Sequence, residues 1–412
     1  MLNPISRFFL RYRPIFLNYK RFSDKAPISR YDPVPSLSRS AANPSRERGK
    51  QWLLQCALQR SPANMSMENI EVCRVMSPDD ANIAGNVHGG TILKMIEEAG
   101  VIIATRHCNE GIKNSSCIAG LVRVERTDFL QPMLIGEVAN VHAELSYASD
   151  HSLEVTVDVW AENLTNGGKR LTNQAYLWYV PVKLTPTPGL GNVPPIKDLT
   201  EDQLREGEKR YQKQKKARAH QKSKQDSNNL YNLRPQNILT VEGSDEIPLH
   251  SVPYSQSTLI SMASPSDCNQ FGYCQGGPTM KNMDTVAGIV AFRHCRTNIV
   301  TASVESLDFH VPVKLGHVMT FTGRMVFTSN RSMEIEVFVD AEDVVKGECF
   351  RCVYALFTYV SLDDKKAVQK VPQLVVRTED EKQRFKEGQS RYEIKKEERL
   401  RALAAKRPKQ EK

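Results

Sequence analysis

A single carboxylate lies in an otherwise apolar segment in the second half of the chain. Asp284 is the only acid between Thr279 and Phe292, and methionine, valine, alanine and isoleucine surround it. Aspartate is a poor residue for a helix interior, and burial of its charge is costly unless neighbouring groups compensate. A carboxylate retained there is a candidate general base. The alternative is an ordinary surface aspartate, which the shortage of polar neighbours disfavours.

A Gly-Gly pair stands before the long apolar segment of each half of the chain. Gly89 and Gly90 precede the first segment, and Gly276 and Gly277 precede the second. Glycine lets the backbone approach a ligand, and the free N–H groups at a helix start carry partial positive charge. We therefore predict that Gly89 and Gly90 form an oxyanion site for a polarised carbonyl, although Gly-Gly alone also suits a tight turn. His88 belongs to the same loop, where a structural imidazole is favoured over a catalytic one.

These motifs occur twice because the chain contains two copies of one module. Residues 85–108 align without a gap with residues 272–295, at a constant offset of 187. From residue 126 onward the offset is 180, after a seven-residue insertion in the stretch 109–121. Two copies are too few for a solenoid, so we predict a duplicated domain that packs as a pseudo-dimer with two clefts.

The two predicted clefts differ in the residues that could do chemistry. Asn86 in the first copy is replaced by Tyr273 in the second, and Asp284 corresponds to Glu97 in the first. If a cleft takes its loop from one copy and its acid from the other, one cleft combines Asn86 with Asp284. The other combines Tyr273 with Glu97. We predict that the first is catalytic and the second degenerate.

Hydrophobic periodicity predicts the fold that positions these residues. The apolar residues between Leu153 and Val159 alternate with polar ones, which is typical of a half-buried antiparallel strand, and the second copy repeats the pattern from Met333 to Val339. The apolar segments Thr91–Thr105 and Thr279–Phe292 are too long for strands. One buried helix wrapped by a sheet is the simplest packing, an α+β hot dog, and we predict two in tandem. Further strands are predicted near 119–126, 136–146, 171–181, 300–306, 316–327 and 351–361.

The domain bounds follow from the repeats and from composition. The segments between and after the repeats are rich in charged residues and are predicted to be solvated helices, with a disordered linker at 226–237. The predicted organisation is a basic N-terminal targeting or disordered segment at 1–50, a first hot-dog domain at 66–185, a charged helix and linker at 186–250, a second hot-dog domain at 251–365, and a charged helix and tail at 366–412.

The run from Asp79 to Gly100, with its weaker second copy, resembles the tandem hot-dog acyl-coenzyme A thioesterases, most closely the brain acyl-CoA hydrolase type. The resemblance covers residues 66 to 400. It implies hydrolysis of fatty acyl-CoA to fatty acid and CoA, with no cofactor, at one site formed by a first-repeat asparagine and a second-repeat aspartate, here Asn86 and Asp284. It also implies a trimer of double-domain chains. One departure is Gln275, where relatives keep histidine.

Other chemistries find little support in the sequence. There is no nucleophile elbow, P-loop, zinc-protease or dinucleotide motif. Two alternatives stay open: a hydroxyacyl-thioester dehydratase, for which His88 is the only nearby catalytic histidine, and a non-catalytic acyl-CoA sensor. Attack by Asp284 itself, through an anhydride, also stays open. Cys349 and Cys352 have metal-site spacing, but on a strand they point to opposite faces, so no metal site is expected.

Charge and composition bear on location and partners. The net charge of +9 is concentrated in residues 1–50, which hold eleven Lys/Arg and three acids. The first 23 residues mix arginines with apolar residues and have no acid, which predicts a mitochondrial presequence and a matrix location, with the cytosol as the alternative. The basic arms do not interleave aromatic residues, so no nucleic-acid partner is expected. No apolar run is long enough to span a membrane.

Overall fold

The computed structural model describes residues 69–110, 117–183, 189–197, 199–228 and 247–405. The predicted presequence and most of the predicted linker at 226–237 lie outside these residues. Within them, no helix is long and apolar enough to cross a membrane.

The two halves share one order of elements, apart from β7 in the first half and α4 in the second. The first half contains β1 (Asn69–Val75), η3 (Pro78–Asp80), α2 (Gly89–Cys108), β2 (Cys117–Val124), β3 (Thr127–Phe129), β4 (Val138–Ala148), β5 (Leu153–Glu162), β6 (Lys169–Lys183), β7 (Gly189–Leu190) and α3 (Glu201–Asn228). The second half contains α4 (Val252–Ser255), β8 (Ser257–Met262), η5 (Pro265–Asp267), α5 (Gly276–Cys295), β9 (Asn298–Val304), β10 (Leu307–Phe309), β11 (Val318–Thr328), β12 (Ser332–Asp343), β13 (Glu348–Leu362) and α6 (Glu379–Ala405). The predicted tandem hot-dog fold is confirmed.

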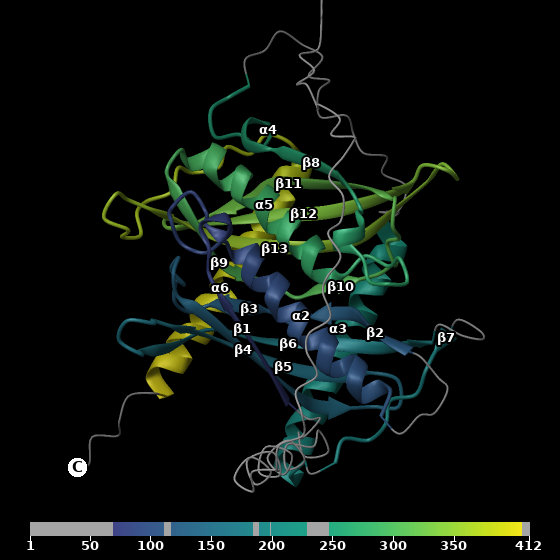
Figure 1. Ribbon diagram of the computed structural model, residues 1–412. Coiled ribbons are helices and arrows are strands. Elements are labelled where there is room, and N and C mark those ends of the chain that lie inside the picture. Colours follow the sequence, from purple (N-terminus) through teal and green to yellow (C-terminus); the bar gives the residue numbers. More distant parts are fainter. Residues whose placement is uncertain (1–68, 111–116, 184–188, 198, 229–246, 406–412) are drawn as a thin grey trace, which may run out of the picture. The chain divides into compact units, whose positions relative to one another are not determined.

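One antiparallel sheet runs through both halves. Its main path is β1-β4-β5-β6-β2-β10-β13-β12-β11-β8, so the two repeats join edge to edge (Figure 1). The junction consists of short pairings between repeats, β2 with β10 and β3 with β9. Because strands of the two repeats hydrogen-bond to each other, the halves form a pseudo-dimer with a shared core.

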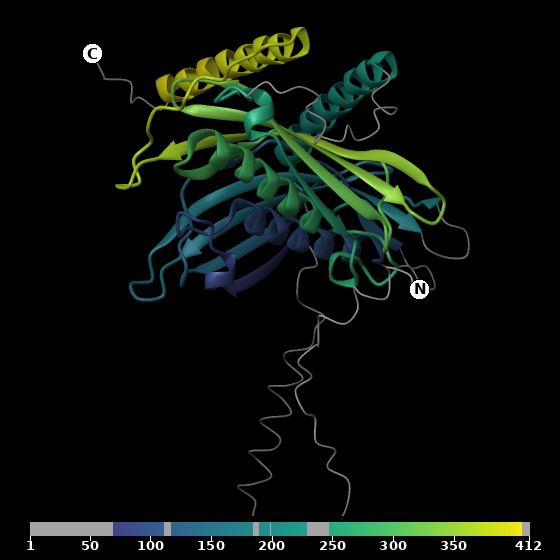
Figure 2. The same ribbon diagram turned by 90° about the horizontal axis from the view of Figure 1, so that it is seen from above.

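The long helices α2 and α5 pack together on one face of this sheet (Figure 2). In β5 the alternating residues from Leu153 to Val159 are fully buried against this layer, as the pattern predicted. Both helices are apolar around most of their circumference because each contacts the sheet and the other helix. The start of each helix is thereby brought against the middle of the other.

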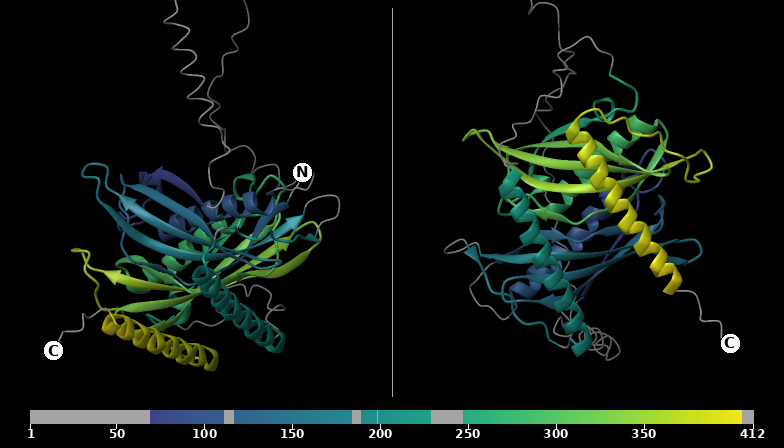
Figure 3. Two further views of the ribbon diagram at one scale, coloured as in Figure 1. Left: turned by 90° about the horizontal axis from the view of Figure 1, so that it is seen from below. Right: turned by 180° about the vertical axis from the view of Figure 1, so that it is seen from behind.

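The charged helices α3 and α6 cover the opposite face of the sheet (Figure 3). They are more than solvated arms, because each holds a buried carboxylate of the sheet. Arg210 of α3 donates to Glu154 at 2.7 Å, and Arg391 of α6 donates to Glu334 at 2.6 Å. Glu154 was expected on a solvated face but is fully buried by this contact. Loss of either arginine would leave a buried charge without its main partner.

Candidate active site

Asp284 lies on α5 at the contact with α2, and it is completely buried. Its carboxylate accepts three hydrogen bonds. Oδ2 accepts from the Gly90 N–H at 2.6 Å, while Oδ1 accepts from Thr301 Oγ1 at 2.9 Å and from the Tyr359 hydroxyl at 2.5 Å. Together these donors provide a partner for both oxygens of the buried carboxylate. The carboxylate is therefore held in a fixed orientation by groups from both repeats.

Gly89 explains how the first-repeat loop can come so close to this acid. A Cβ at this position would lie 2.9 Å from Asp284 Oδ2 and 2.8 Å from Thr301 Oγ1. No side chain fits at these distances, so glycine is required by the close approach and not only by a turn. The helix start of one repeat and the acid of the other are thus brought together, as predicted for the complementary cleft.

His88 caps α2 beside the same carboxylate. Its Nδ1 accepts from the Gly90 N–H at 3.1 Å and lies 3.4 Å from Asp284 Oδ2. The Gly90 N–H is therefore shared between the imidazole and the acid. We predicted that this N–H would face a substrate carbonyl; in the structure it holds the general-base candidate, because an anionic oxygen is the stronger acceptor.

Asn86 is buried in the same loop, with 6% of its surface exposed. Its described contacts are made by its backbone, which pairs with Leu134 and exchanges hydrogen bonds with Asn82. Asn82 Oδ1 accepts from the N–H groups of Ala84 at 2.9 Å and Asn86 at 3.1 Å, and so shapes the loop. The catalytic role of Asn86 stays a prediction.

Two residues that contact the acid, and one that shapes the loop before α2, were missed by the sequence reasoning. Thr301 and Tyr359 contact the carboxylate from β9 and β13, and only the tertiary fold reveals this. Asn82 could have been found, because its counterpart Asn269, at the offset of 187, is also asparagine. Asn269 makes the equivalent turn and lines a cavity in the second cleft.

The second cleft contains Glu97 and Tyr273, as predicted, but its acid is held differently. Glu97 Oε2 accepts from the Gly277 N–H at 3.3 Å, and the Tyr179 hydroxyl donates to the Glu97 backbone carbonyl at 3.3 Å. Burial raises the pKa of the Glu97 carboxyl to about 7. In the first cleft, burial and then the nearby charge of Asp284 raise the pKa of Tyr359. Its hydroxyl therefore keeps the proton that it donates to Asp284.

The described residues contain no group of three or more His, Cys, Asp or Glu that could hold a metal ion. Cys349 is exposed and Cys352 buried on β13, so their side chains point to opposite faces as predicted.

Comparison with known proteins assigns the class of this fold and site. Residues 84–167 and 271–348 each match the thioesterase superfamily, so the chain is a tandem member of that superfamily. It is 55% identical over 325 residues to the cytosolic acyl coenzyme A thioester hydrolase of Rattus norvegicus, covering 78% of this chain and 82% of the relative. The Homo sapiens protein of the same name is 54% identical over 321 residues, covering 77% and 81%. The chain belongs to this family of acyl-CoA thioester hydrolases.

Solved structures of the same class were also found. The acyl-CoA hydrolase of Staphylococcus aureus in complex with butyryl coenzyme A, coenzyme A and coenzyme A disulfide is 28% identical. The alignment covers 38% of this chain and 96% of that chain, with a TM-score of 0.35.

The comparisons correct the predicted location. The relatives from rat, mouse and human are all named cytosolic, which contradicts the mitochondrial matrix and favours the alternative. Arginines interleaved with apolar residues are typical of a mitochondrial presequence. Composition alone, however, does not determine whether a protein is imported. The segment that carried the prediction lies outside the described residues.

Proposed function

We propose that this chain hydrolyses fatty acyl-CoA thioesters to a fatty acid and CoA at the cleft that contains Asp284. The observation that carries the proposal is a fully buried carboxylate whose donors come from both repeats, at the start of α2. Family membership supports the substrate class, because the relatives are named acyl-CoA thioester hydrolases.

The proposed reaction needs no covalent intermediate. Asp284 accepts a proton from water, and the water oxygen attacks the thioester carbon. Negative charge develops on the carbonyl oxygen, where the Gly89 N–H and the partial positive charge at the start of α2 stabilise it. The C–S bond then breaks, and the CoA sulfur leaves with the proton that Asp284 had accepted. In the alternative, Asp284 itself attacks the thioester carbon and expels the CoA thiolate to form an anhydride. Water that then cleaves the anhydride at the aspartyl carbonyl would leave a solvent oxygen in the aspartate.

We assign the loop asparagines to orientation of the water or the thioester carbonyl. Asn86 is the original candidate, and Asn82 is added because its counterpart Asn269 lines the equivalent cleft. Separate alanine variants distinguish them. Loss of kcat with Asn82→Ala and little change with Asn86→Ala would transfer the role to Asn82, and the reverse result would keep it at Asn86.

A hydroxyacyl-thioester dehydratase is the second candidate, because His88 Nδ1 lies only 3.4 Å from Asp284 Oδ2. The Gly90 N–H already donates to that nitrogen, which favours a capping role for the imidazole. Purified protein should release thiol from hexadecanoyl-CoA and form no enoyl product from 3-hydroxyhexadecanoyl-CoA. Enoyl product without thiol release would reverse the assignment, and tight binding with neither product would identify a sensor.

We also propose that the chain assembles as a trimer of double hot dogs, on the basis of the family resemblance. Light scattering of the purified protein should then give three times the chain mass of 46.5 kDa. A monomeric mass would overturn this assembly without affecting the hydrolysis proposal.

A further inference from the structure

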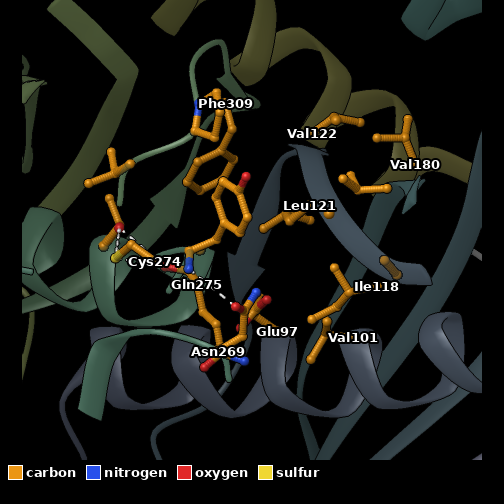
Figure 4. Close-up of a pocket in the computed structure, with 18 of the residues that line it drawn as sticks. Glu97, Val101, Ile118, Leu121, Val122, Val180, Asn269, Cys274, Gln275 and Phe309 are labelled. Atoms are coloured by element: carbon orange, nitrogen blue, oxygen red, sulfur yellow. Dashed lines mark hydrogen bonds between the residues drawn. The ribbon is translucent and has the colours of Figure 1, made fainter. Parts of the chain in front are cut away.

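The cleft that lacks the complete catalytic set contains a well-formed cavity of about 420 Å³. Glu97 and the loop before α5 form its polar end, and β2 and β6 contribute a long apolar wall (Figure 4). This volume lies within the range of small-molecule sites, which are mostly apolar with a few placed polar groups. The aliphatic and aromatic lining residues include Val101, Ile118, Leu121, Val122, Val180 and Phe309.

In the alignment of the two repeats, the residues that line this cavity correspond to those of the Asp284 cleft. Glu97 corresponds to Asp284 at the offset of 187, and Leu121 corresponds to Thr301 at the offset of 180. The helix start is also retained, because the Gly277 N–H donates to Glu97 as the Gly90 N–H donates to Asp284. The cleft therefore keeps the shape of a thioester site.

The same comparison explains why this cleft should not cleave its ligand. Leu121 offers no hydroxyl where Thr301 donates to the acid, and the Tyr179 hydroxyl donates to the backbone of Glu97 instead of its carboxylate. The Glu97 carboxylate accepts only from backbone N–H groups at the start of α5, that of Gly277 at 3.3 Å, whereas Asp284 has three donors at 2.9 Å or less and two of these are side-chain hydroxyls. The acid of this cleft therefore lacks the two side-chain hydroxyl donors that orient the Asp284 carboxylate.

A cation at the cavity fits a phosphorylated ligand. Tyr273, which lines the cavity, pairs through its backbone with Lys314, whose Nζ lies 6.0 Å from the tyrosine ring centre. The equivalent pair beside the working cleft is Asn86 with Leu134, so the first repeat has no cation at the matching position. The exposed ammonium of Lys314 can attract the phosphates of CoA while the apolar wall accepts the acyl chain.

We propose that the Glu97 cleft binds a fatty acyl-CoA thioester without hydrolysing it, so that each chain carries one hydrolytic and one purely binding site. The ligand class rests on the proposed function of the neighbouring cleft. An uncharged thioester carbonyl suits the buried Glu97 carboxyl, whereas a free fatty acid would place a second carboxylate against it. CoA alone lacks the chain that fills the apolar wall.

Titration calorimetry with S-decyl-CoA, a thioether that cannot be hydrolysed, tests the proposal on the full chain. Wild type should bind two molecules per chain. Val101→Trp and Val180→Trp, which fill the cavity from α2 and from β6, should each bind one. Ile260→Trp adds the same bulk at an exposed position on β8 and should still bind two. Lys314→Glu should lower the affinity of the second site for S-decyl-CoA about tenfold, because a charged contact to the ligand is lost. The affinity of the first site serves as the internal reference.

The outcomes separate this inference from the proposed function. A single S-decyl-CoA per wild-type chain, or two in both cavity-filling variants, would overturn it. Decanoate or CoA that saturates the second site as tightly as S-decyl-CoA would also overturn the thioester assignment. Two bound thioethers without any hydrolysis of decanoyl-CoA would instead refute the proposed function and leave the second site intact.

Discussion

Replacement of Asp284 by asparagine tests the central chemical claim. The variant keeps the side-chain volume at a fully buried position but removes the group that accepts a proton. General-base catalysis contributes about 10²- to 10⁴-fold, or about 2.7 to 5.4 kcal/mol of transition-state stabilisation. The amide also points an N–H at one of the three donors from Gly90, Thr301 and Tyr359, which disturbs the site further. We therefore expect kcat to fall toward the upper end, about 10³- to 10⁴-fold.

The assay is release of CoA thiol from hexadecanoyl-CoA at saturating substrate. Glu97→Gln is the matched control, because it makes the same acid-to-amide change at the equivalent position of the second repeat. Its kcat should stay within about twofold of wild type, since the proposed base and its donors are untouched. Equal losses in the two variants, or an Asp284→Asn enzyme that retains a tenth of its activity, would refute a single working cleft. Thermal melts followed by circular dichroism verify that both variants fold.

Three further results are expected from the same contacts. Thr301→Val removes one donor to Asp284, and kcat should fall about tenfold with little change in KM. The reason is that a hydrogen bond to a charged group contributes about 1.5–3 kcal/mol. An unchanged kcat would show that the Thr301 hydroxyl does not position the base. Tyr359→Phe should reduce kcat similarly. Tyr179→Phe loses a hydrogen bond to a backbone carbonyl and should lower the free energy of unfolding by about 0.5–1.5 kcal/mol without changing kcat. Equal losses of kcat in the two variants would contradict a functional difference between the two clefts. Glu97→Gln should remove a pH dependence of stability. The pKa of Glu97 in the folded protein is raised from 4.5 to about 7. Between these pH values Glu97 is deprotonated in the unfolded chain before it is in the folded protein, so the stability of the wild type falls as pH rises. Between pH 5 and pH 8 the loss of wild-type stability corresponds to about 2–3 kcal/mol. Urea unfolding at these two pH values should show the variant gaining about this amount relative to wild type at the higher pH. Parallel pH dependences of the two proteins would contradict the raised pKa.

Periodicity and duplication were sufficient to predict the fold. Alternation of apolar and polar residues in β5 and β12 specifies which residues face the core. The two long apolar segments could be buried only as helices, each packed between the sheet and the other helix. The equivalence of Glu97 and Asp284 also follows from the sequence, because the repeats align there without a gap. These features depend on neighbours along the chain or on the internal repeat.

The N-terminal composition misled the prediction of location, and the charged arms were only partly understood. Helical charge patterns indicated α3 and α6, but not that Arg210 and Arg391 reach buried glutamates of the sheet. A charged residue on an alternating strand looks solvated in the sequence whether or not a distant helix covers it.

The sequence by itself determined that two copies of one module exist, that each supplies a glycine-rich helix start and an acid, and that only one combination pairs aspartate with asparagine. The tertiary structure decided what each acid can do. Thr301 and Tyr359 reach Asp284 from strands 17 and 75 positions away, and the Gly90 N–H arrives from the other repeat. The positions of these donors are set by strand register and by the packing of α2 against α5 rather than by local sequence.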